Sequence, residues 1–246
     1  RMSSTDTPYL HSPGAVVKGD GTPFSVFTPF WRAWSALPAA SPVDADPQSA
    51  EQSALPSAAI PDGDPDASGS GGADEHATSL LESFVALPVE SYDADRNRVD
   101  LAATSRLGTA LHFGEIHPRT VVAAVGPDGA GFVRQLCWRE FYADVLWRRP
   151  DAAWGNVDRR FDAFPWRDDR SAFDLWCRGR TGFPMVDAGM RQLLTTGWMH
   201  NRSRMVVASF LTKDLLLPWQ WGARWFLTHL RDGDVANNSL GWQWTA

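Results

Sequence analysis

The strongest constraint on the fold is the helical period of residues 131–149. Phe132 and Leu136 flank an apolar stripe, and Pro150 cannot continue a helix. The polar side of the stretch is rich in arginine. An apolar residue recurs every four positions, which predicts one long helix with a single buried face, and the residues of that face are Val133, Cys137, Phe141 and Val145.

Shorter segments show the same period, over residues 118–125, 169–178, 185–196, 200–217 and 219–230. Asp169 is a suitable N-cap, Gly197 a suitable C-terminal stop, and Pro218 a terminator. Ser79 would cap a further helix that carries Phe84. No segment alternates polar and apolar residues, so the sequence predicts an all-α body.

Residues 38–78 are rich in Pro, Ala, Ser, Asp and Gly and have almost nothing to bury. They are therefore predicted to be a disordered acidic linker. The segment holds eight of the 29 acidic residues and none of the 23 basic ones, so the net charge of −6 hides a weakly basic remainder. Clustered arginines in that remainder could bind a polyanion locally.

Residues 1–37 end in aromatic side chains spaced three and four positions apart. This spacing predicts one aromatic helix face, for which core packing is a sufficient explanation. The residues are Phe24, Phe27, Phe30, Trp31 and Trp34.

Composition argues against several classes of protein. No apolar run approaches the eighteen or so residues of a membrane span, and the first ten residues are polar, unlike a secretory signal. A cytoplasmic, monomeric protein is expected. Cys137 and Cys177 lack a metal-type spacing and are expected to be reduced, buried thiols. The six histidines form no ligand cluster, so no metal site is expected.

The C-terminal stretch from Gly197 to Ala246 gathers side chains suited to a large aromatic ligand. Tryptophans supply flat faces and N–H donors, arginines can hold phosphates, and carboxylates and amides can bind the edge of a heterocycle. Together they predict a site for an aromatic ligand, a nucleic acid, or both. The residues are Trp198, Trp219, Trp221, Trp225, Trp242, Trp244, Arg202, Arg204, Asp232, Asp234, Asn201, Asn237 and Asn238.

Several motifs occur in one order over more than half the chain. They are Thr104-Ser105-Arg106-Leu107, Trp138-Arg139-Glu140-Phe141-Tyr142, Thr181-Gly182-Phe183-Pro184, Gly197-Trp198-Met199-His200-Asn201-Arg202, Asp232-Gly233-Asp234, Asn237-Asn238 and Gly241-Trp242-Gln243-Trp244. In this order they closely resemble the flavin-binding domain of the photolyase/cryptochrome family, specifically class I cyclobutane pyrimidine dimer photolyases.

The resemblance implies an all-helical pocket that holds FAD in a folded U shape. No Gly-x-Gly-x-x-Gly follows a predicted strand, which agrees with a pocket of that kind. Residues 79–246 would form the helical FAD- and DNA-binding domain, and residues 1–37 would be the end of an N-terminal α/β antenna domain. By the same resemblance the chain is expected to be shortened at both ends.

The resemblance also assigns flavin contacts. Asn238 would face the flavin N5, where a neutral amide can accept from a protonated nitrogen or donate to a bare one. Asp232 could pair with Arg204 beside the ring. Taken alone, the acidic turn and the loop over residues 104–108 could equally be helix caps. The implied cofactor contacts are Tyr92, Thr104, Ser105, Arg106, Leu107, Gly108, Phe132, Asn201, Arg204, Asp232, Gly233, Asp234 and Asn238.

In the family, excited reduced FAD repairs a cyclobutane dimer by electron transfer while the dimer is flipped out of the DNA. Trp242, Trp219 and Trp166 match the family's chain of tryptophans that reduces the flavin, with Trp242 nearest to it. Each of the three, taken singly, would more simply be a core residue. The implied lesion and DNA contacts are Arg96, Gln135, Trp138, Arg139, Tyr142, Arg202, Met205 and Trp244.

Gln135 departs from the pattern, because class I dimer photolyases usually carry a glutamic acid there. At this position the chain is similar to (6-4) photolyases and animal cryptochromes. Asn201 and Met205 stand where (6-4) enzymes carry histidines, which favours cyclobutane dimers as the lesion. The alternatives are a cryptochrome-like photoreceptor without repair activity and an inactive fragment. Asn238 argues against the photoreceptor, since plant-type cryptochromes carry Asp there and insect ones Cys.

Overall fold

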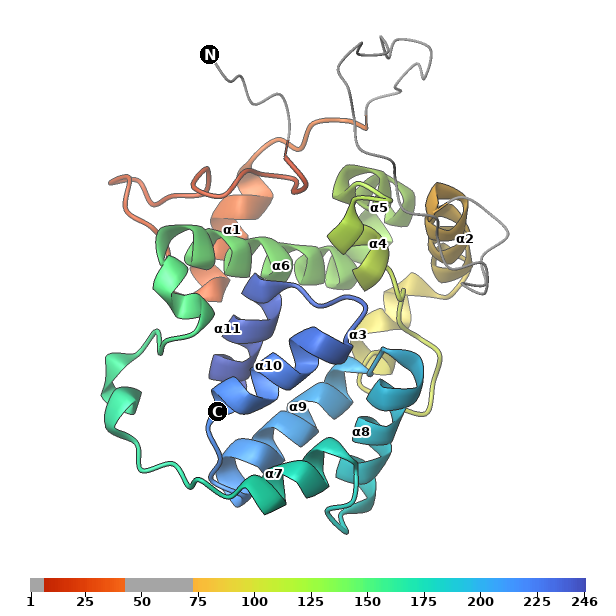
Figure 1. Cartoon of the computed structure of the whole chain (residues 1–246). Coiled ribbons are helices and arrows are strands. Elements are labelled where there is room, and N and C mark those ends of the chain that lie inside the picture. The colour runs from red at the N-terminus through yellow and green to blue at the C-terminus, as the bar shows by residue number, and fades with distance from the viewer. Residues whose placement is uncertain (1–6, 43–72) are drawn as a thin grey trace, which may run out of the picture.

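The computed structural model describes residues 7–42 and 73–246 of the chain (Figure 1). Within these ranges the regular elements are helices, and the only β-type pairing is an isolated bridge between Val17 and Pro23. The all-α prediction is therefore confirmed. None of the helices in the described ranges is long and apolar enough to span a membrane.

The central element is α6, Ala130–Arg148, which crosses the molecule between α1 and α11 (Figure 1). It is the long helix expected from the four-residue period, and it ends just before Pro150. Of the four residues expected to form the buried stripe, Cys137 and Phe141 are buried, whereas Val133 and Val145 are half-buried. Cys137 and Cys177 are both free and buried.

Five helices form the lower half of the molecule in Figure 1: α7 (Arg170–Cys177), α8 (Pro184–Thr196), α9 (Asn201–Ser209), α10 (Trp219–His229) and α11 (Val235–Thr245). Their ends follow the sequence signals. The Asp169 carboxylate accepts from the Ala172 N–H at 2.9 Å, and Gly197 ends α8 in the left-handed region at φ 66°.

The helix expected over residues 200–217 is instead divided. It is α-helical as far as Ser209 and continues as a π-helix over Phe210–Asp214. The Leu215 N–H donates to the Phe210 carbonyl, five residues back, which widens the turn. The chain therefore leaves the helix before Leu216, whose φ of 55° redirects it towards α10.

Four further helices pack around the N-terminal part of α6 at Phe132 and Leu136: α2 (Ala73–Val85), α3 (Tyr92–Asp95), α4 (Gly108–Phe113) and α5 (Pro118–Val125). The expectation that Ser79 caps α2 is wrong. Ala77, Leu81 and Phe84 form one buried face at helical spacing, and this face carries the helix back beyond residue 79. The expected linker thus includes helical residues 73–78, whereas its residues 43–72 lie outside the described ranges.

The N-terminal segment is attached to α6 by two buried carboxylates. Glu140 accepts hydrogen bonds from the Leu10 N–H at 2.5 Å, the His11 N–H at 3.2 Å and the Trp34 indole N–H at 2.6 Å. Asp144 accepts from the Gly14 N–H at 2.6 Å. Burial disfavours a charged carboxyl and raises the pKa of Glu140, although these donors oppose the shift.

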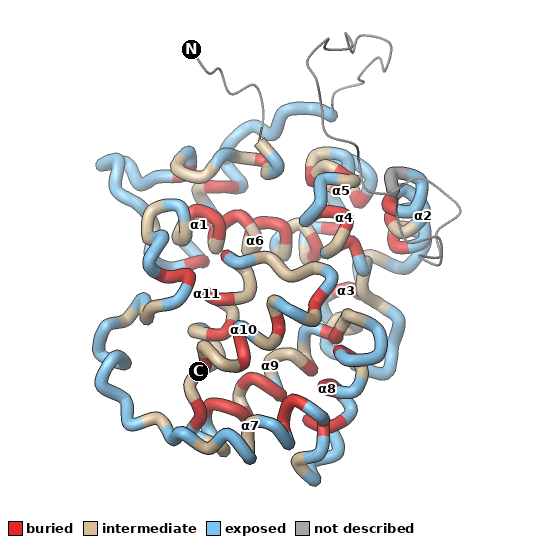
Figure 2. Tube along the Cα trace, in the orientation of Figure 1, coloured by how far each residue is buried: buried red, intermediate tan, exposed pale blue. Residues whose placement is uncertain are grey.

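Helix α1, Phe27–Ala36, packs against α6 through three of the five aromatic residues expected to share one helix face, whereas Phe24 precedes the helix and Trp31 is half-buried. Phe27, Phe30 and Trp34 are buried in a cluster that includes Phe141. Figure 2 shows the buried positions of α1 and α6 where the two helices meet. The N-terminal segment therefore contributes to the same core as α6.

Candidate functional site

A cavity of about 610 Å³ lies between α6, α9 and α11, with α3 and α4 at its other side. Its size falls in the range of about 300–1,000 Å³ that is typical of ligand sites. The cavity brings together many residues that are distant in sequence but were expected to bind flavin, lesion or DNA. They are Tyr92, Arg96, Thr104, Gly108, Gln135, Trp138, Arg139, Tyr142, Asn201, Arg202, Arg204, Met205, Asp232, Gly233, Asp234, Asn238, Trp242 and Trp244.

Six predicted site residues do not line the cavity: Ser105, Arg106, Leu107, Phe132, Trp166 and Trp219. Leu107 and Phe132 are buried in the core cluster beneath it. The Ser105 hydroxyl accepts from the Leu107 N–H at 3.3 Å, and the Arg106 guanidinium lies over the Trp198 ring at 4.4 Å. Thr104 and Gly108 are therefore the residues of this loop that reach the cavity.

Arg204 and Asp232 form the main ion pair of the cavity wall. Arg204 Nη2 lies 3.1 Å from Asp232 Oδ1 and 2.9 Å from Oδ2, and Arg204 Nε donates to the Met199 carbonyl at 2.8 Å. Gly108 packs against this pair so closely that a Cβ there would lie 2.7 Å from Asp232 Oδ2. The absence of a side chain at Gly108 thus leaves the carboxylate in place.

Asp234 caps α11 and faces the cavity at the same time. Its Oδ1 accepts from the backbone N–H and from Nδ2 of Asn237, both at 2.7 Å. Its Oδ2 lies 3.9 Å from His112 Nδ1. The two alternatives for this carboxylate, a helix cap and a site residue, are therefore compatible.

Asn238 has a fixed amide orientation. Its Nδ2 donates to the Ala223 carbonyl of α10 at 2.8 Å. A backbone carbonyl only accepts, so the nitrogen must face α10, and Oδ1 is the group left for a ligand. Asn238 lines the cavity and can therefore act there as a hydrogen-bond acceptor.

One edge of the cavity carries two adjacent cations. Arg96 lies over the Tyr92 ring at 5.5 Å, and Arg202 donates from Nε and Nη2 to Asn97 Oδ1 at 2.8 and 2.6 Å. Burial and the neighbouring charge of Arg96 lower the pKa of Arg202. Such a pair is suited to a bound anion because like charges disfavour each other without one.

Arg139 is more fully occupied by contacts within the chain. Its Nη1 donates to the Pro8 carbonyl at 2.9 Å, and its Nη2 donates to the Leu111 carbonyl at 3.0 Å. The guanidinium also lies over the Tyr9 ring at 4.5 Å. Arg139 therefore ties the N-terminal segment to α4 as well as lining the cavity.

The α6 wall is aromatic. Trp138 stacks on Phe27, and Tyr142 lies 5.3 Å from Trp138 between ring centroids. Burial raises the pKa of Tyr142 to about 12. Gln135 donates from Nε2 to the Gly131 carbonyl at 3.2 Å, which leaves its Oε1 available. Trp244 lines the opposite side with 63% of its surface exposed.

The three tryptophans of the expected electron path share one core cluster. Trp242 is 3% exposed and Trp219 1%, and Trp166 packs against the same cluster. A Cβ at Gly222 would lie 2.1 Å from Trp242 Cη2, so the Trp242 ring rests directly on the α10 backbone. Trp219 precedes Gly222 by three residues on that helix and therefore lies on a neighbouring part of its surface.

Some cavity residues were not predicted as site residues, including Asp93, Leu111, His112 and Phe226. His112 follows Gly108 by four residues on α4, so helical spacing could have placed it on the same face. Phe226 has no such signal, because it differs in no visible way from the other apolar residues of α10.

Comparison with known proteins agrees with this geometry. Residues 132–246 match the family described as the FAD binding domain of DNA photolyase. The chain is 42% identical over 244 residues to a deoxyribodipyrimidine photo-lyase of Streptomyces griseus, covering 96% of this chain and 53% of that protein. It is 38% identical over 263 residues to one from a Synechococcus strain, covering 96% and 54%.

Among solved structures, a bacterial class III photolyase from Agrobacterium tumefaciens superposes with a TM-score of 0.87 at 36% identity, covering 97% of this chain and 54% of that one. The chain thus spans about half the length of the relatives that it matches. FAD is the cofactor of the matched domain, as expected from the motifs. The chain belongs to the photolyase/cryptochrome family.

Proposed function

We propose that the cavity holds FAD next to a flipped-out pyrimidine dimer and that the protein repairs cyclobutane pyrimidine dimers in DNA under blue light. The observation that carries this proposal is the composition of the cavity walls. Of the residues that line the cavity, those expected to contact flavin come from α3, α4 and the loop before it, α9, α11 and the turn before α11, whereas four of those expected to contact the lesion or DNA come from α6. One cavity therefore has a side for each of two aromatic ligands.

The donors and acceptors present fit a flavin. Asn238 offers an amide oxygen that can accept from a ring N–H, and Arg204 with Asp232 offers a charged pair beside it. Gly108 leaves space against Asp232 that a side chain would fill. The chemistry that FAD would supply here, in its reduced form and after light absorption, is the electron that opens the cyclobutane ring.

The residues of the chain would position both partners and exclude water. Trp138 and Trp244 would pack against the flat faces of the dimer. Gln135 would accept a hydrogen bond through Oε1, but it cannot release a proton. Asn201 and Met205 cannot protonate a lesion near neutral pH either, which favours cyclobutane dimers over (6-4) products.

The remaining residues would hold DNA and deliver electrons to a resting flavin. Arg96 and Arg202 form the pair of cations at the cavity edge and would contact phosphates. Trp166, Trp219 and Trp242 would pass electrons inward to an oxidised flavin. On this account residues 79–246 act as the FAD- and DNA-binding unit, to which residues 1–37 are attached as the end of a preceding domain.

The proposal is tested with the FAD-loaded, chemically reduced protein and two DNA substrates under blue light, one containing a cyclobutane dimer and one a (6-4) product. We expect repair of the first substrate only, read as recovery of absorbance by the restored pyrimidines. Trp138→Ala should remove most of the repair. The matched control is Trp147→Ala on the same helix, since Trp147 is 61% exposed and does not line the cavity. Repair of (6-4) products alone would contradict the proposal.

A further inference from the structure

We propose that Asn156, oriented by Asp162, is a positioning residue that stabilises the oxidised form of Trp219 and so favours electron transfer from Trp219 to Trp242. The inference rests on the proposed function, because it concerns the tryptophan path to the flavin. It assigns a role to the segment that connects α6 and α7.

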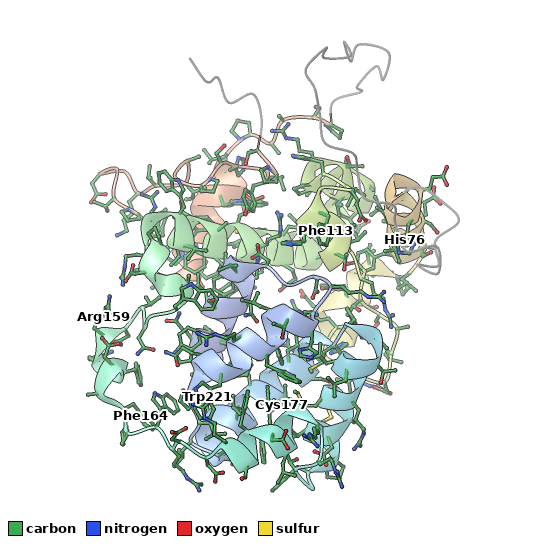
Figure 3. All side chains as sticks on the ribbon, in the orientation of Figure 1. His76, Phe113, Arg159, Phe164, Cys177 and Trp221 are labelled. Carbon is green, nitrogen blue, oxygen red and sulfur yellow. The ribbon has the colours of Figure 1, made fainter. Side chains whose placement is uncertain are left out.

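The key contact is a hydrogen bond to a buried indole. Trp219 Nε1 donates to Asn156 Oδ1 at 2.8 Å, and Trp219 is 1% exposed. On its other side, Asn156 Nδ2 donates to Asp162 Oδ1 at 2.8 Å. Asp162 also pairs with Arg159, labelled in Figure 3, at 3.4 Å.

Only one orientation of the Asn156 amide satisfies both partners. An indole N–H can only donate, and an ionised carboxylate can only accept. The amide oxygen must therefore face Trp219, and the amide nitrogen must face Asp162. The negative charge of Asp162 also polarises the amide, which makes its oxygen a better acceptor.

Trp242 and Trp225 differ in this respect from Trp219 and from Trp176, whose Nε1 donates to the Val207 carbonyl at 3.0 Å. The Nε1 atoms of Trp242 and Trp225 are buried and have no hydrogen-bond partner among the described residues. An oxidised Trp242 therefore lacks the stabilising acceptor that Trp219 has. This difference favours transfer of the positive charge from Trp242 to Trp219.

The segment that holds Asn156 is itself anchored. Gln243 of α11 accepts from the Val157 N–H at 2.7 Å and donates to the Ala152 carbonyl at 2.9 Å. The same segment leads past Phe164, labelled in Figure 3, to Trp166, whose ring centroid is 4.3 Å from that of Phe164. One segment thus supplies both the acceptor for Trp219 and the more exposed tryptophan.

The step involves one electron and no change in covalent bonds. An electron leaves Trp219 for the oxidised indole of Trp242, and the Nε1 proton stays on Trp219, shared with Asn156 Oδ1. The oxidant that starts the sequence is a photoexcited oxidised flavin. The N–H of a positively charged indole is a stronger donor than that of a neutral one, so the hydrogen bond to Asn156 strengthens when Trp219 is oxidised. The hydrogen bond therefore stabilises the oxidised indole more than the neutral indole.

The test uses Asn156→Leu, which keeps bulk at the site but removes the acceptor. After a laser flash on the FAD-loaded protein in its oxidised form, we expect the yield of long-lived indole radical to fall about fivefold, as expected when a charge-assisted hydrogen bond is lost. Asp162→Asn removes the charge that polarises the Asn156 amide but keeps the acceptor for Trp219. It should therefore lower the radical yield as well, but by less than Asn156→Leu does. The indole N–H resonance of Trp219 can be assigned in the NMR spectrum of the flavin-free protein, because it is missing from Trp219→Phe. In Asn156→Leu this resonance should move upfield, since its hydrogen bond is lost.

The matched control is Arg160→Leu, since Arg160 belongs to the same segment but pairs with Asp158 and is 87% exposed. Its radical yield and its Trp219 resonance should stay close to those of the unaltered protein. If the radical yield is normal in Asn156→Leu but the radical is lost in Trp219→Phe, the proposed role of Asn156 is wrong while the tryptophan path still stands. If the radical yield is normal in Trp219→Phe, the tryptophan path itself is wrong. Neither outcome would affect repair by the chemically reduced protein, which tests the proposed function separately.

Discussion

Phe27 and Trp138 lie face to face, with ring centroids 3.6 Å apart and planes inclined by 8°. Phe27 belongs to α1 and Trp138 to α6, so the stack joins the N-terminal segment to a wall of the cavity. A stacked neighbour restricts the rotamer of an indole and thereby fixes the surface that it presents. The N-terminal segment therefore supports the candidate site as well as the core.

Phe27→Ala should weaken both stability and lesion binding. Truncating a buried Phe to Ala lowers the free energy of unfolding by about 3–5 kcal/mol, and the loss of an aromatic pair accounts for about 0.5–1.5 kcal/mol of this decrease. Phe30→Ala is the matched control, since Phe30 is also buried on α1, but its ring packs against Phe24 and Phe141 rather than stacking on Trp138. Chemical denaturation should give similar losses for both variants. Affinity for dimer-containing DNA should fall several-fold further in Phe27→Ala, and equal affinities would rule out a supporting role for the stack.

Two glycine substitutions should have opposite effects on stability. Alanine favours a helix over glycine by about 1 kcal/mol. Gly241 has nothing within 4 Å of its Cβ position, so Gly241→Ala should stabilise the protein. At Gly222 a Cβ would lie 2.1 Å from Trp242 and 2.7 Å from Leu211, so Gly222→Ala should destabilise it through overpacking. The urea midpoint is the measurement, and a higher midpoint for Gly222→Ala would contradict the close packing of Trp242.

His200 should make the protein less stable at mildly acidic pH. Burial, followed by the charges of Arg202, Arg204 and Arg96, lowers its pKa from the ordinary 6.5. The unfolded chain therefore takes up a proton more readily than the folded one below pH 6.5. This contribution to stability is fully present above pH 6.5 and is lost as the pH falls from 6.5 towards the lowered pKa.

The His200 prediction is tested by the free energy of unfolding at pH 7.5 and pH 5.5. His200 Nδ1 accepts from the Arg202 N–H at 3.1 Å as the N-cap of α9, and Asn is a good N-cap. His200→Asn should therefore reduce the pH dependence while retaining stability at the higher pH. An unchanged pH dependence in this variant would assign the effect to other groups.

Trp242→Phe should block light-driven reduction of the oxidised flavin while largely sparing repair by the chemically reduced protein. Phe preserves much of the packing but is far harder to oxidise. Trp225→Phe provides the matched control, because Trp225 also has a buried N–H without a partner in the part of the chain that the structure describes, but it lies outside the proposed path. If Trp242→Phe is photoreduced as efficiently as Trp225→Phe, Trp242 does not carry the electrons.

Helix periodicity predicted most of the fold, because each helix buries a face whose spacing is visible in the sequence. The clearest case is α6, with its residues at every fourth position. The start of α2 was missed because Ala77, fully buried, is a small residue that contributes little to the apolar pattern. The π-helix after Ser209 was missed because its apolar pattern continues that of an ordinary helix.

The site could be predicted only through the motifs, since its walls come from helices far apart in the chain. Spacing gave no means to foresee that Phe27 would stack on Trp138 or that Arg139 would bind the carbonyls of Pro8 and Leu111. These contacts depend on how the N-terminal segment crosses α6. Likewise, nothing local to Asn156 indicates a contact with Trp219, because the two are joined only by tertiary packing.

The central claim is that the cavity is a flavin site, and the most direct measurement is the stoichiometry of FAD binding to the folded chain. We expect one FAD per chain, with the absorption band of bound flavin and a helical circular dichroism spectrum. Gly108→Val should abolish FAD binding by displacing Asp232. Gly19→Ala should leave FAD binding unchanged, because no atom lies within 4 Å of the Cβ position of Gly19. A folded chain that binds no FAD, or that binds it equally well with Val at position 108, would contradict the account.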